Sequence, residues 1–290
     1  MDKPAHFHAV RPMFALVVLA CGGSSQAQTL DLDTQLMLAT VKVSDPHAAG
    51  SAFILGRPAP GGGKTEWLLV TAEHTLRSTQ HPEVTVVYHR RAADGGYTKA
   101  PTQVMVRRGG KPLWTKHPTA DVAVLPVTPP ADALPALVPV DRLATDADLE
   151  RLEIHPGDAV RCVGFPHPNQ FESGAAGFAV TRAGCIASYP LLPTKVTKTF
   201  LIDLNTFEGD SGAPVYISES HRATAKAADA DAAPARLILG LVTGQHFLDE
   251  EYRMVYQTGK VRHRMGLGVI VHAATIRETI DQLPASPAGK

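Results

Sequence analysis

Three short stretches of this 290-residue sequence hold side chains suited to nucleophilic chemistry. They are "LLVTAEHTL" with His74, "TADVAVLPV" with Asp121 and "FEGDSGAPVY" with Ser211. A serine hydroxyl is a weak nucleophile and needs an adjacent base, and an imidazole serves best when a carboxylate fixes its tautomer. We therefore expect His74, Asp121 and Ser211 to form a catalytic triad.

The glycines around Ser211 meet a second requirement of acyl transfer. An oxyanion forms when the hydroxyl attacks a carbonyl, and two backbone N–H groups must converge on it through a sharp turn that bulky residues obstruct. We expect the amides of Gly209 and Ser211 to be these donors. Asp210 is expected to support the turn, and Pro214 to begin the next strand.

The elements around these residues are short apolar or β-branched runs closed by Gly, Pro or Asn, which is typical of an all-β sandwich or barrel. Six runs precede a stretch rich in Pro and Ala, and six follow it. The first six begin at Leu38, Ser51, Glu66, Val84, Gln103 and Asp121, and the second six at Ala159, Phe178, Lys198, Ala213, Leu237 and Leu267. The stretch between them indicates a linker between two units.

The motifs resemble those of trypsin-like serine peptidases of the chymotrypsin fold, bacterial secreted type. The resemblance rests on "GDSGAP", on the order His74, Asp121, Ser211, and on "VTAEH" and "DVAVL" at the family's His and Asp strands, and it covers residues 38–283. It implies two six-stranded antiparallel β-barrels, polypeptide substrates, an acyl-enzyme and no cofactor. An α/β-hydrolase is disfavoured, because its acid and His follow the serine.

The resemblance also implies a domain plan. It places the His and Asp in an N-terminal barrel (28–130), a linker at 131–156, and the Ser and oxyanion hole in a C-terminal barrel (157–273). Apolar residues at helical spacing predict a C-terminal helix at 274–283, followed by a disordered tail at 284–290. The alanine-rich stretch 221–236 is typical of an inserted loop or a marginal helix.

Substrate preference follows from the same resemblance. The specificity pocket is expected to comprise Asn205, Thr206, Val242, Thr243, Gly244 and Gly268. Asn205 is neutral, so charge pairing with a substrate Lys or Arg is disfavoured, and we expect a small or uncharged residue there. The alternative function is a catalytically weak fold that acts as a protein-binding or chaperone module, because Glu208 beside Gly209 would oppose an oxyanion if it turned inward.

The family's activation switch has no counterpart in the sequence. No "IVGG"-like N-terminus precedes the first barrel, so a new N-terminal amine is not expected to pair with Asp210. We expect Asp210 to be held by local hydrogen bonds instead, and the protein to be competent after export.

The N-terminus predicts export. Lys3 and Arg11 precede nine apolar residues and then "GGSSQAQ", the pattern of a signal peptide over residues 1–27. Nine helical residues rise about 14 Å, against a hydrocarbon core of about 30 Å, so a permanent membrane span is not expected. We expect a secreted or periplasmic protein. The alternative is a lipoprotein, because "VLAC" resembles a lipobox that would anchor Cys21 to a membrane.

Composition narrows the remaining partners and ligands. Lys plus Arg and Asp plus Glu both number 28, so no broad attraction to nucleic acid is implied. The 13 His show no HExxH pattern, and we expect no metal. Cys162 and Cys185 either form one disulfide or are two buried thiols, and these alternatives stay open. The sequence gives no oligomeric state.

Overall fold

The computed structural model describes residues 30–59, 64–168, 170–218 and 236–284. The chain divides into two units, Met1–Leu30 and Asp31–Lys290, and every helix and strand described below belongs to the second. The signal peptide, Cys21, nearly all of the alanine-rich stretch, and the tail beyond Pro284 lie outside the described residues. Those predictions therefore stay predictions.

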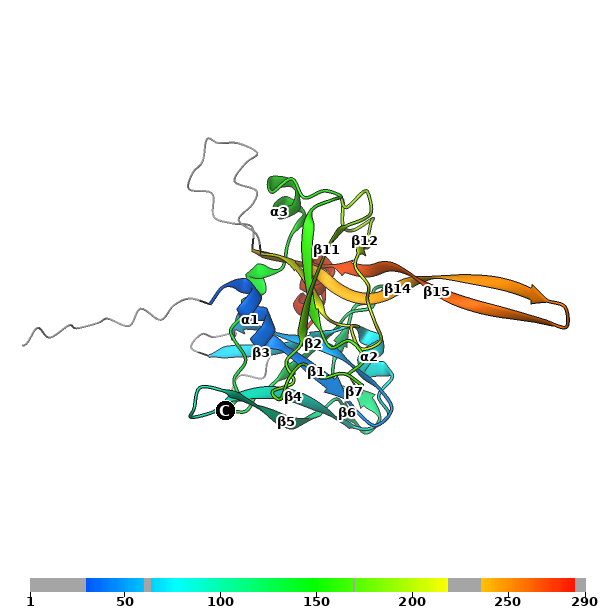
Figure 1. Ribbon diagram of the computed structural model, residues 1–290. Helices are drawn as coiled ribbons and strands as arrows, with labels where there is room; N and C mark the ends of the chain where they lie inside the picture. Colours follow the sequence, from blue (N-terminus) through cyan, green and yellow to red (C-terminus); the bar gives the residue numbers. More distant parts are fainter. Residues whose placement is uncertain (1–29, 60–63, 169, 219–235, 285–290) are drawn as a thin grey trace, which may run out of the picture. The chain divides into compact units, whose positions relative to one another are not determined.

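The N-terminal part of the second unit forms a seven-stranded antiparallel sheet in the order β5-β4-β1-β2-β3-β9-β8 (Figure 1). Its strands are β1 (Thr40–Ser44), β2 (Ala49–Pro58), β3 (Thr65–Thr71), β4 (Glu83–Arg91), β5 (Tyr97–Met105), β8 (Thr115–Lys116) and β9 (Ala123–Val127). β6 (Arg107–Arg108) and β7 (Lys111–Pro112) form a separate pair.

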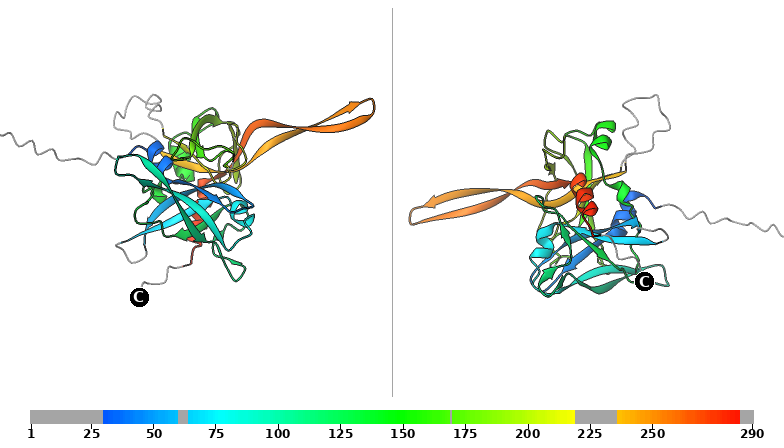
Figure 2. Two further views of the ribbon diagram at one scale, coloured as in Figure 1. Left: turned by 60° about the horizontal axis from the view of Figure 1, so that its bottom comes forward. Right: turned by 180° about the vertical axis from the view of Figure 1, so that it is seen from behind.

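The C-terminal part closes into a six-stranded barrel in the order β10-β11-β12-β15-β14-β13. Its strands are β10 (Ala159–Gly164), β11 (Val180–Ile186), β12 (Thr199–Asp203), β13 (Pro214–Ile217), β14 (Leu237–Met254) and β15 (Gln257–His272). The last two strands are far longer than the barrel requires. Figures 1 and 2 show them leaving the barrel as a two-stranded arm, which we call the ribbon and define as residues 247–264.

The predicted chymotrypsin-like all-β class is confirmed, with two differences in detail. Of the two six-stranded barrels expected, only the C-terminal one is closed among the described residues, whereas the N-terminal strands form an open order from β5 to β8. The N-terminal sheet has seven strands rather than six, because the two-residue strand β8 adds to β9 at the edge, with Thr115 opposite Val124. The short C-terminal helix is also confirmed as α4 (Ala273–Asp281), and Ile276 and Ile280 lie on its buried side.

Four further short helices were not predicted. They are α1 (Leu32–Ala39), α2 (Glu73–Arg77), the 3₁₀ helix η1 (Val140–Arg142) and α3 (Asp146–Arg151). The run expected to begin a strand at Leu38 is helical up to Ala39, and β1 begins only at Thr40. The Asp31 carboxylate caps the start of this helix by accepting from the Thr34 N–H at 2.8 Å. η1 and α3 lie within the stretch predicted as a linker.

One hydrophobic core joins the two halves of this unit. It combines Phe53, Leu68 and Val124 of the N-terminal sheet with barrel residues such as Ile202 and Leu241. A second, smaller core lies inside the N-terminal sheet. Because the larger core is shared, sheet and barrel hold each other in place around the residues between them.

Candidate active site

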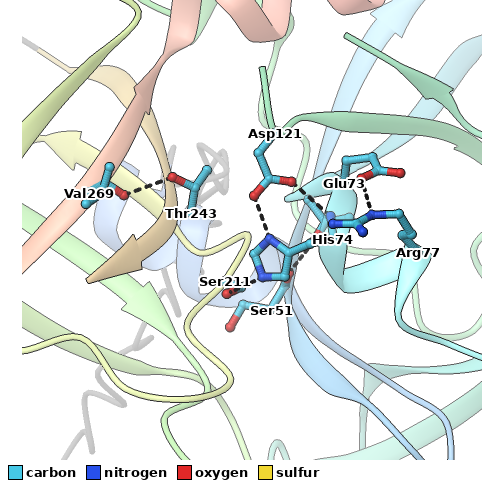
Figure 3. Close-up of polar contacts among 9 residues, drawn as sticks. Ser51, Glu73, His74, Arg77, Asp121, Ser211, Thr243 and Val269 are labelled. Carbon is cyan, nitrogen blue, oxygen red and sulfur yellow. Dashed lines mark hydrogen bonds and ion pairs between the residues drawn. The ribbon is translucent and has the colours of Figure 1, made fainter. Parts of the chain in front are cut away.

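His74, Asp121 and Ser211 form one chain of hydrogen bonds (Figure 3). The His74 Nδ1 atom lies 2.5 Å from Asp121 Oδ2, and His74 Nε2 lies 2.8 Å from Ser211 Oγ. The backbone N–H of His74 also donates to Asp121 Oδ1 at 2.9 Å. The carboxylate therefore holds both the ring and the backbone of His74.

The strand order explains why these residues meet. β3 and β9 are neighbours, with Thr71 opposite Ala123. His74 follows β3 on the one-turn helix α2, and Asp121 precedes β9, so both lie at the same end of the pair. Ser211 comes from the loop between β12 and β13 of the barrel.

The electrostatics of the site favour an ionised carboxylate beside the imidazole. Burial alone would raise the pKa of the Asp121 carboxyl, but the hydrogen bonds from His74 and the charge of Arg77 hold that pKa below its usual value. An ionised Asp121 accepts from Nδ1–H, which leaves Nε2 of a neutral ring as an acceptor for the Ser211 hydroxyl. The His74 and Asp121 side chains are each 32% exposed, so a substrate can reach them.

The turn before Ser211 requires glycine. Gly209 has φ of +94°, and a Cβ there would lie 2.4 Å from the Phe165 carbonyl oxygen. The Glu208 carbonyl accepts from the His167 N–H at 2.7 Å. Since the C=O and N–H of a trans peptide point in opposite directions, the Gly209 N–H points away from His167.

Both amides expected at the oxyanion site lack a partner. Within the ranges that the structure describes, neither the Gly209 N–H nor the Ser211 N–H donates to a protein acceptor. Buried or half-buried amides are normally paired, so two unpaired donors on either side of Asp210 are unusual. They leave room for an oxygen of a bound molecule.

Arg182, which sequence reasoning missed, holds Asp210. The Asp210 side chain is fully buried and accepts from both terminal nitrogens of Arg182, at 2.6 and 2.9 Å, and from the Phe207 N–H at 2.7 Å. Burial raises the pKa of the Asp210 carboxyl, while the guanidinium and the amide oppose that shift. The expected local hydrogen bond is thus present, but an ion pair from β11 accompanies it. The only sequence signal was a charged residue inside the run "FAVTRAGCIAS".

Ser51, which was not predicted from the sequence, holds the turn by hydrogen bonds from the N-terminal sheet. Its hydroxyl donates to the Gly209 carbonyl at 2.7 Å and accepts from the Phe165 N–H at 2.9 Å. Its own N–H donates to the Ser211 carbonyl at 3.0 Å, and its carbonyl accepts from the Thr71 hydroxyl at 2.7 Å. Ser51 is completely buried, so one residue of β2 fixes two peptide groups of the turn.

The residues expected in the specificity pocket come from β14, from β15 and from the loop that follows β12. Thr206 is buried and packs on Gly268, where a Cβ would lie 2.8 Å from Thr206 Cγ2. The Thr243 hydroxyl donates to the Val269 carbonyl at 3.3 Å (Figure 3). A Cβ on Gly244 would meet no atom within 4 Å, so space is open there.

Asn205 and Val242 take different places in this region. Asn205 is exposed, and its carbonyl accepts from Arg182 at 2.9 Å. Val242 is buried and bonds through its backbone to Gly212 and Ala213. It therefore supports the turn that carries Ser211 more than it lines an open pocket.

Glu208 borders a separate pocket next to the turn. This pocket is also lined by His47, His167 and Gln170. Glu208 is exposed, which leaves its charge solvated.

The two cysteines do not form a disulfide. Both are free, and they lie on neighbouring strands with Cys162 opposite Arg182 and Cys185 opposite Ala159. The bridge left open by the sequence is therefore absent, because three positions of register separate the two thiols on β10. Burial raises the pKa of the Cys162 thiol to about 12.

The described residues contain neither a metal cluster nor a membrane-spanning helix. No group of three or more His, Cys, Asp or Glu side chains in the described ranges could hold a metal ion. Among the helices of those same ranges, none is both long and apolar enough to cross a membrane.

Comparison with known proteins gave similarity to solved structures alone. No family model matches the chain, and no curated protein matches it. An inactive mutant form of Rv3671c from M. tuberculosis H37Rv superposes with a TM-score of 0.45 at 17% identity, over 89% of this chain and 93% of that one. A mutant of human heparin binding protein gives 0.48 and 13%, over 88% and 96%. An inactivated protease paralogue of the scabies mite gives 0.46 and 12%, over 89% and 97%. These TM-scores lie below 0.5 and these identities below 25%. The trypsin-like fold is therefore assigned from the strand order described above.

Proposed function

We propose that this protein is an exported serine endopeptidase. The observation that carries the proposal is the hydrogen-bonded chain Asp121–His74–Ser211 beside two amides that have no partner among the described residues. A nucleophile, a base oriented by a third group, and donors for the developing anion are the parts that acyl transfer requires.

The reaction proceeds in two halves. Ser211 Oγ attacks the peptide carbonyl carbon while His74 Nε2 takes the hydroxyl proton, and the Gly209 and Ser211 amides bind the oxyanion. His74 then gives the proton to the leaving amine, the C–N bond breaks, and an acyl-enzyme remains. Water, deprotonated by His74, attacks the acyl carbon, the ester bond to Ser211 Oγ breaks, and His74 returns the proton to Oγ as the acid product leaves. Asp121 stabilises the imidazolium in both halves.

The substrates are polypeptides with a small or uncharged residue at the cleaved bond. Asn205 offers no charge, and the Thr206 hydroxyl is buried without a hydrogen-bond partner in the described part of the chain. Neither group would compensate a buried Lys, Arg or Glu side chain of a substrate.

Labelling of Ser211 tests the proposal. The mature protein is incubated with a fluorophosphonate probe, and the labelled residue is identified by mass spectrometry, with Ser211→Ala as control. We expect one adduct, on Ser211. A folded protein without an adduct would favour the alternative, a trypsin-like fold that acts as a protein-binding or chaperone module.

Asp121→Asn tests the role of the carboxylate. An amide at this position favours the wrong imidazole tautomer, and in the prototype of this triad the change lowers turnover roughly 10⁴-fold. We expect a fall of that order in kcat with little change in the urea midpoint. An unchanged kcat would remove Asp121 from the mechanism.

Export is tested separately by the N-terminus of the mature chain. The signal-peptide pattern over residues 1–27 supports cleavage after Ala27. Mass spectrometry of the exported protein should give a chain that begins at Gln28. A chain that begins at a lipidated Cys21 would instead establish the lipoprotein alternative.

A further inference from the structure

The ribbon is an extension that the fold does not need. β14 pairs with β13 only up to Leu241, and β15 pairs with β12 only from Leu267. Beyond these residues, eight cross-strand pairs run from Phe247–Arg264 to Met254–Gln257. At about 3.3 Å per residue the ribbon is roughly 26 Å long. A two-stranded hairpin by itself is at best marginally stable in water, which points to a contact that the ribbon serves.

The two faces of the ribbon differ in character. One face carries ion pairs, Asp249–Arg262 at 2.7 Å and Glu251–Lys260 at 3.0 Å, and its one exposed aromatic ring, Phe247, lies 5.2 Å from the Arg262 guanidinium. The other face presents large apolar side chains with exposed fractions of 39 to 60%, namely Leu248, Tyr252, Met254 and Val261. Apart from the Glu250–His263 ion pair, this face has the composition of a contact surface.

The tip of the ribbon consists of two exposed apolar residues. Val255 and Tyr256 connect the strands and are 86% and 98% exposed. Two-residue hairpin turns most often contain Asn, Asp or Gly. Neither Val255 nor Tyr256 has a positive φ, so this turn does not require those residues. The unusual feature is the exposure of two large apolar side chains to solvent at the tip, which is expected at a contact surface.

The free edge of β14, which continues into the ribbon, begins next to Ser211. Val242 exchanges backbone hydrogen bonds with Ala213 and Gly212, at 2.9 and 2.8 Å, directly after Ser211. From Thr243 to Met254, β14 has no strand on the side away from β15 among the described residues. A free strand edge of this kind is a template on which an extended chain can add.

The base of the ribbon contacts the loop before Ser211. The Arg264 guanidinium lies 4.9 Å from the centre of the Phe207 ring, and a Cβ on Gly266 would lie 3.4 Å from Asn205 Oδ1. The free edge of β14 therefore runs from a fixed point at the nucleophile out to the tip.

We infer that the β14 edge and the apolar face of the ribbon bind the substrate polypeptide, as an extended apolar stretch that precedes the cleaved bond. The inference rests on the proposed function. β14 runs outward from Ser211, and antiparallel addition is the more stable pairing, so the substrate strand runs inward and its N-terminal residues lie on the ribbon. Alternate side chains of that strand pack beside Leu248, Tyr252 and Met254.

A shortened ribbon tests the inference. Residues 249–262 are replaced by Asn-Gly, which closes a two-residue turn between Leu248 and His263 and keeps Arg264 on Phe207. Two peptides are compared that share one cleavage sequence, selected from a substrate library. One has four residues before the cleaved bond, and the other has ten more with apolar side chains at alternate positions.

The wild type should cleave the longer peptide at least tenfold better in kcat/KM, mainly through KM. The shortened variant should cleave both peptides alike, at the wild-type rate for the shorter one. Equal cleavage of the two peptides by the wild type would overturn the inference, and so would a preference that survives the shortening.

Point variants separate the apolar face from the ribbon as a whole. The triple change L248S, Y252S and M254S should remove most of the preference for the longer peptide. The matched change E251Q and K260Q, on the charged face, should keep it. Binding of phosphatidylglycerol vesicles through Val255 and Tyr256, without any peptide preference, would assign the ribbon to a lipid surface and overturn the inference.

Failure of the proposed function gives a different result. Fluorescence anisotropy of the longer peptide is measured with Ser211→Ala protein, with and without the shortened ribbon, and needs no turnover. An unlabelled Ser211 together with ribbon-dependent binding would refute the peptidase and leave a peptide-binding ribbon. A labelled Ser211 with ribbon-independent binding would refute the ribbon alone.

Discussion

At the level of single residues, the turn that carries Ser211 depends on two side chains far away in the sequence. Ser51 binds the peptide groups on either side of Asp210, and Arg182 neutralises the Asp210 carboxylate. The first comes from the N-terminal sheet and the second from the barrel. The turn is therefore held from both halves of the protein.

Replacing Ser51 by Ala should harm both the site and the stability. The change removes the donor to the Gly209 carbonyl and leaves the buried Phe165 N–H without its acceptor, which costs about 1–3 kcal/mol. We expect a kcat at least several-fold lower, a nearly unchanged KM, and a lower urea midpoint. Thr40→Val is the matched control, since the Thr40 hydroxyl is buried without a partner in the described ranges. Equal effects of the two changes would refute the role of Ser51.

Replacing Arg182 alone should lower the free energy of unfolding much more than replacing both partners of the ion pair. Arg182→Met leaves the fully buried Asp210 carboxylate unpaired, which we expect to cost about 3–5 kcal/mol of unfolding free energy. Arg182→Met with Asp210→Asn should cost clearly less than the sum of the single changes. Chemical denaturation of the four proteins measures this coupling. Strict additivity would show that the two side chains act independently.

At the level of elements, the junction of β15 and α4 contains a buried histidine. His272 is 2% exposed, its Nε2 atom has no partner in the described part of the chain, and burial lowers its pKa to about 4 against a weak opposing effect of Asp146. The folded protein thus disfavours the imidazolium that the unfolded chain accepts below about pH 6.5.

His272 should make the fold less stable in mild acid. Its pKa is lowered on folding, so its contribution is fully present above pH 6.5 and is lost as the pH falls toward 4, by up to about 3 kcal/mol. Urea unfolding at several pH values measures the effect in the wild type and in His272→Phe. The difference between the two proteins should shift by this amount between pH 7 and pH 4. Parallel curves would contradict it.

Sequence patterns predicted the strands that appear as continuous apolar runs. They did not predict features that depend on contacts between residues far apart in the sequence. The barrel strands were visible as apolar runs, and the order of His74, Asp121 and Ser211 indicated the arrangement seen. The ribbon was missed because charges interrupt its apolar positions, so no run extends beyond Gly244 or before Leu267. Ser51 and Arg182 were missed because each acts on a turn that local sequence cannot bring near it.

At the level of the whole molecule, the shared core joins the sheet and the barrel into one cooperative unit. Phe53 and Leu68 pack in the same cluster as Ile202 and Leu241. Separating the halves would expose that cluster on both sides, at about 25 cal/mol per Å² of apolar surface. We therefore expect no state with one half folded and the other unfolded.

Two local probes test this cooperativity. Both tryptophans, Trp67 and Trp114, lie in the N-terminal part, and the buried thiol of Cys162 lies in the barrel. Tryptophan fluorescence and the reactivity of Cys162, in a protein with Cys21→Ser and Cys185→Ser, should give the same urea midpoint. Two midpoints separated by more than the error of the fit would show independent halves.

The ion pair between Arg182 and Asp210 also bears on when the catalytic turn reaches its final conformation. Its two charges lie within one folded unit, on β11 and in the loop before β13. We therefore expect the turn to be complete once that unit folds, without a cut in the chain to supply a positive charge. On this expectation, control over the proposed peptidase would act on its location, on its access to substrates, or through an inhibitor.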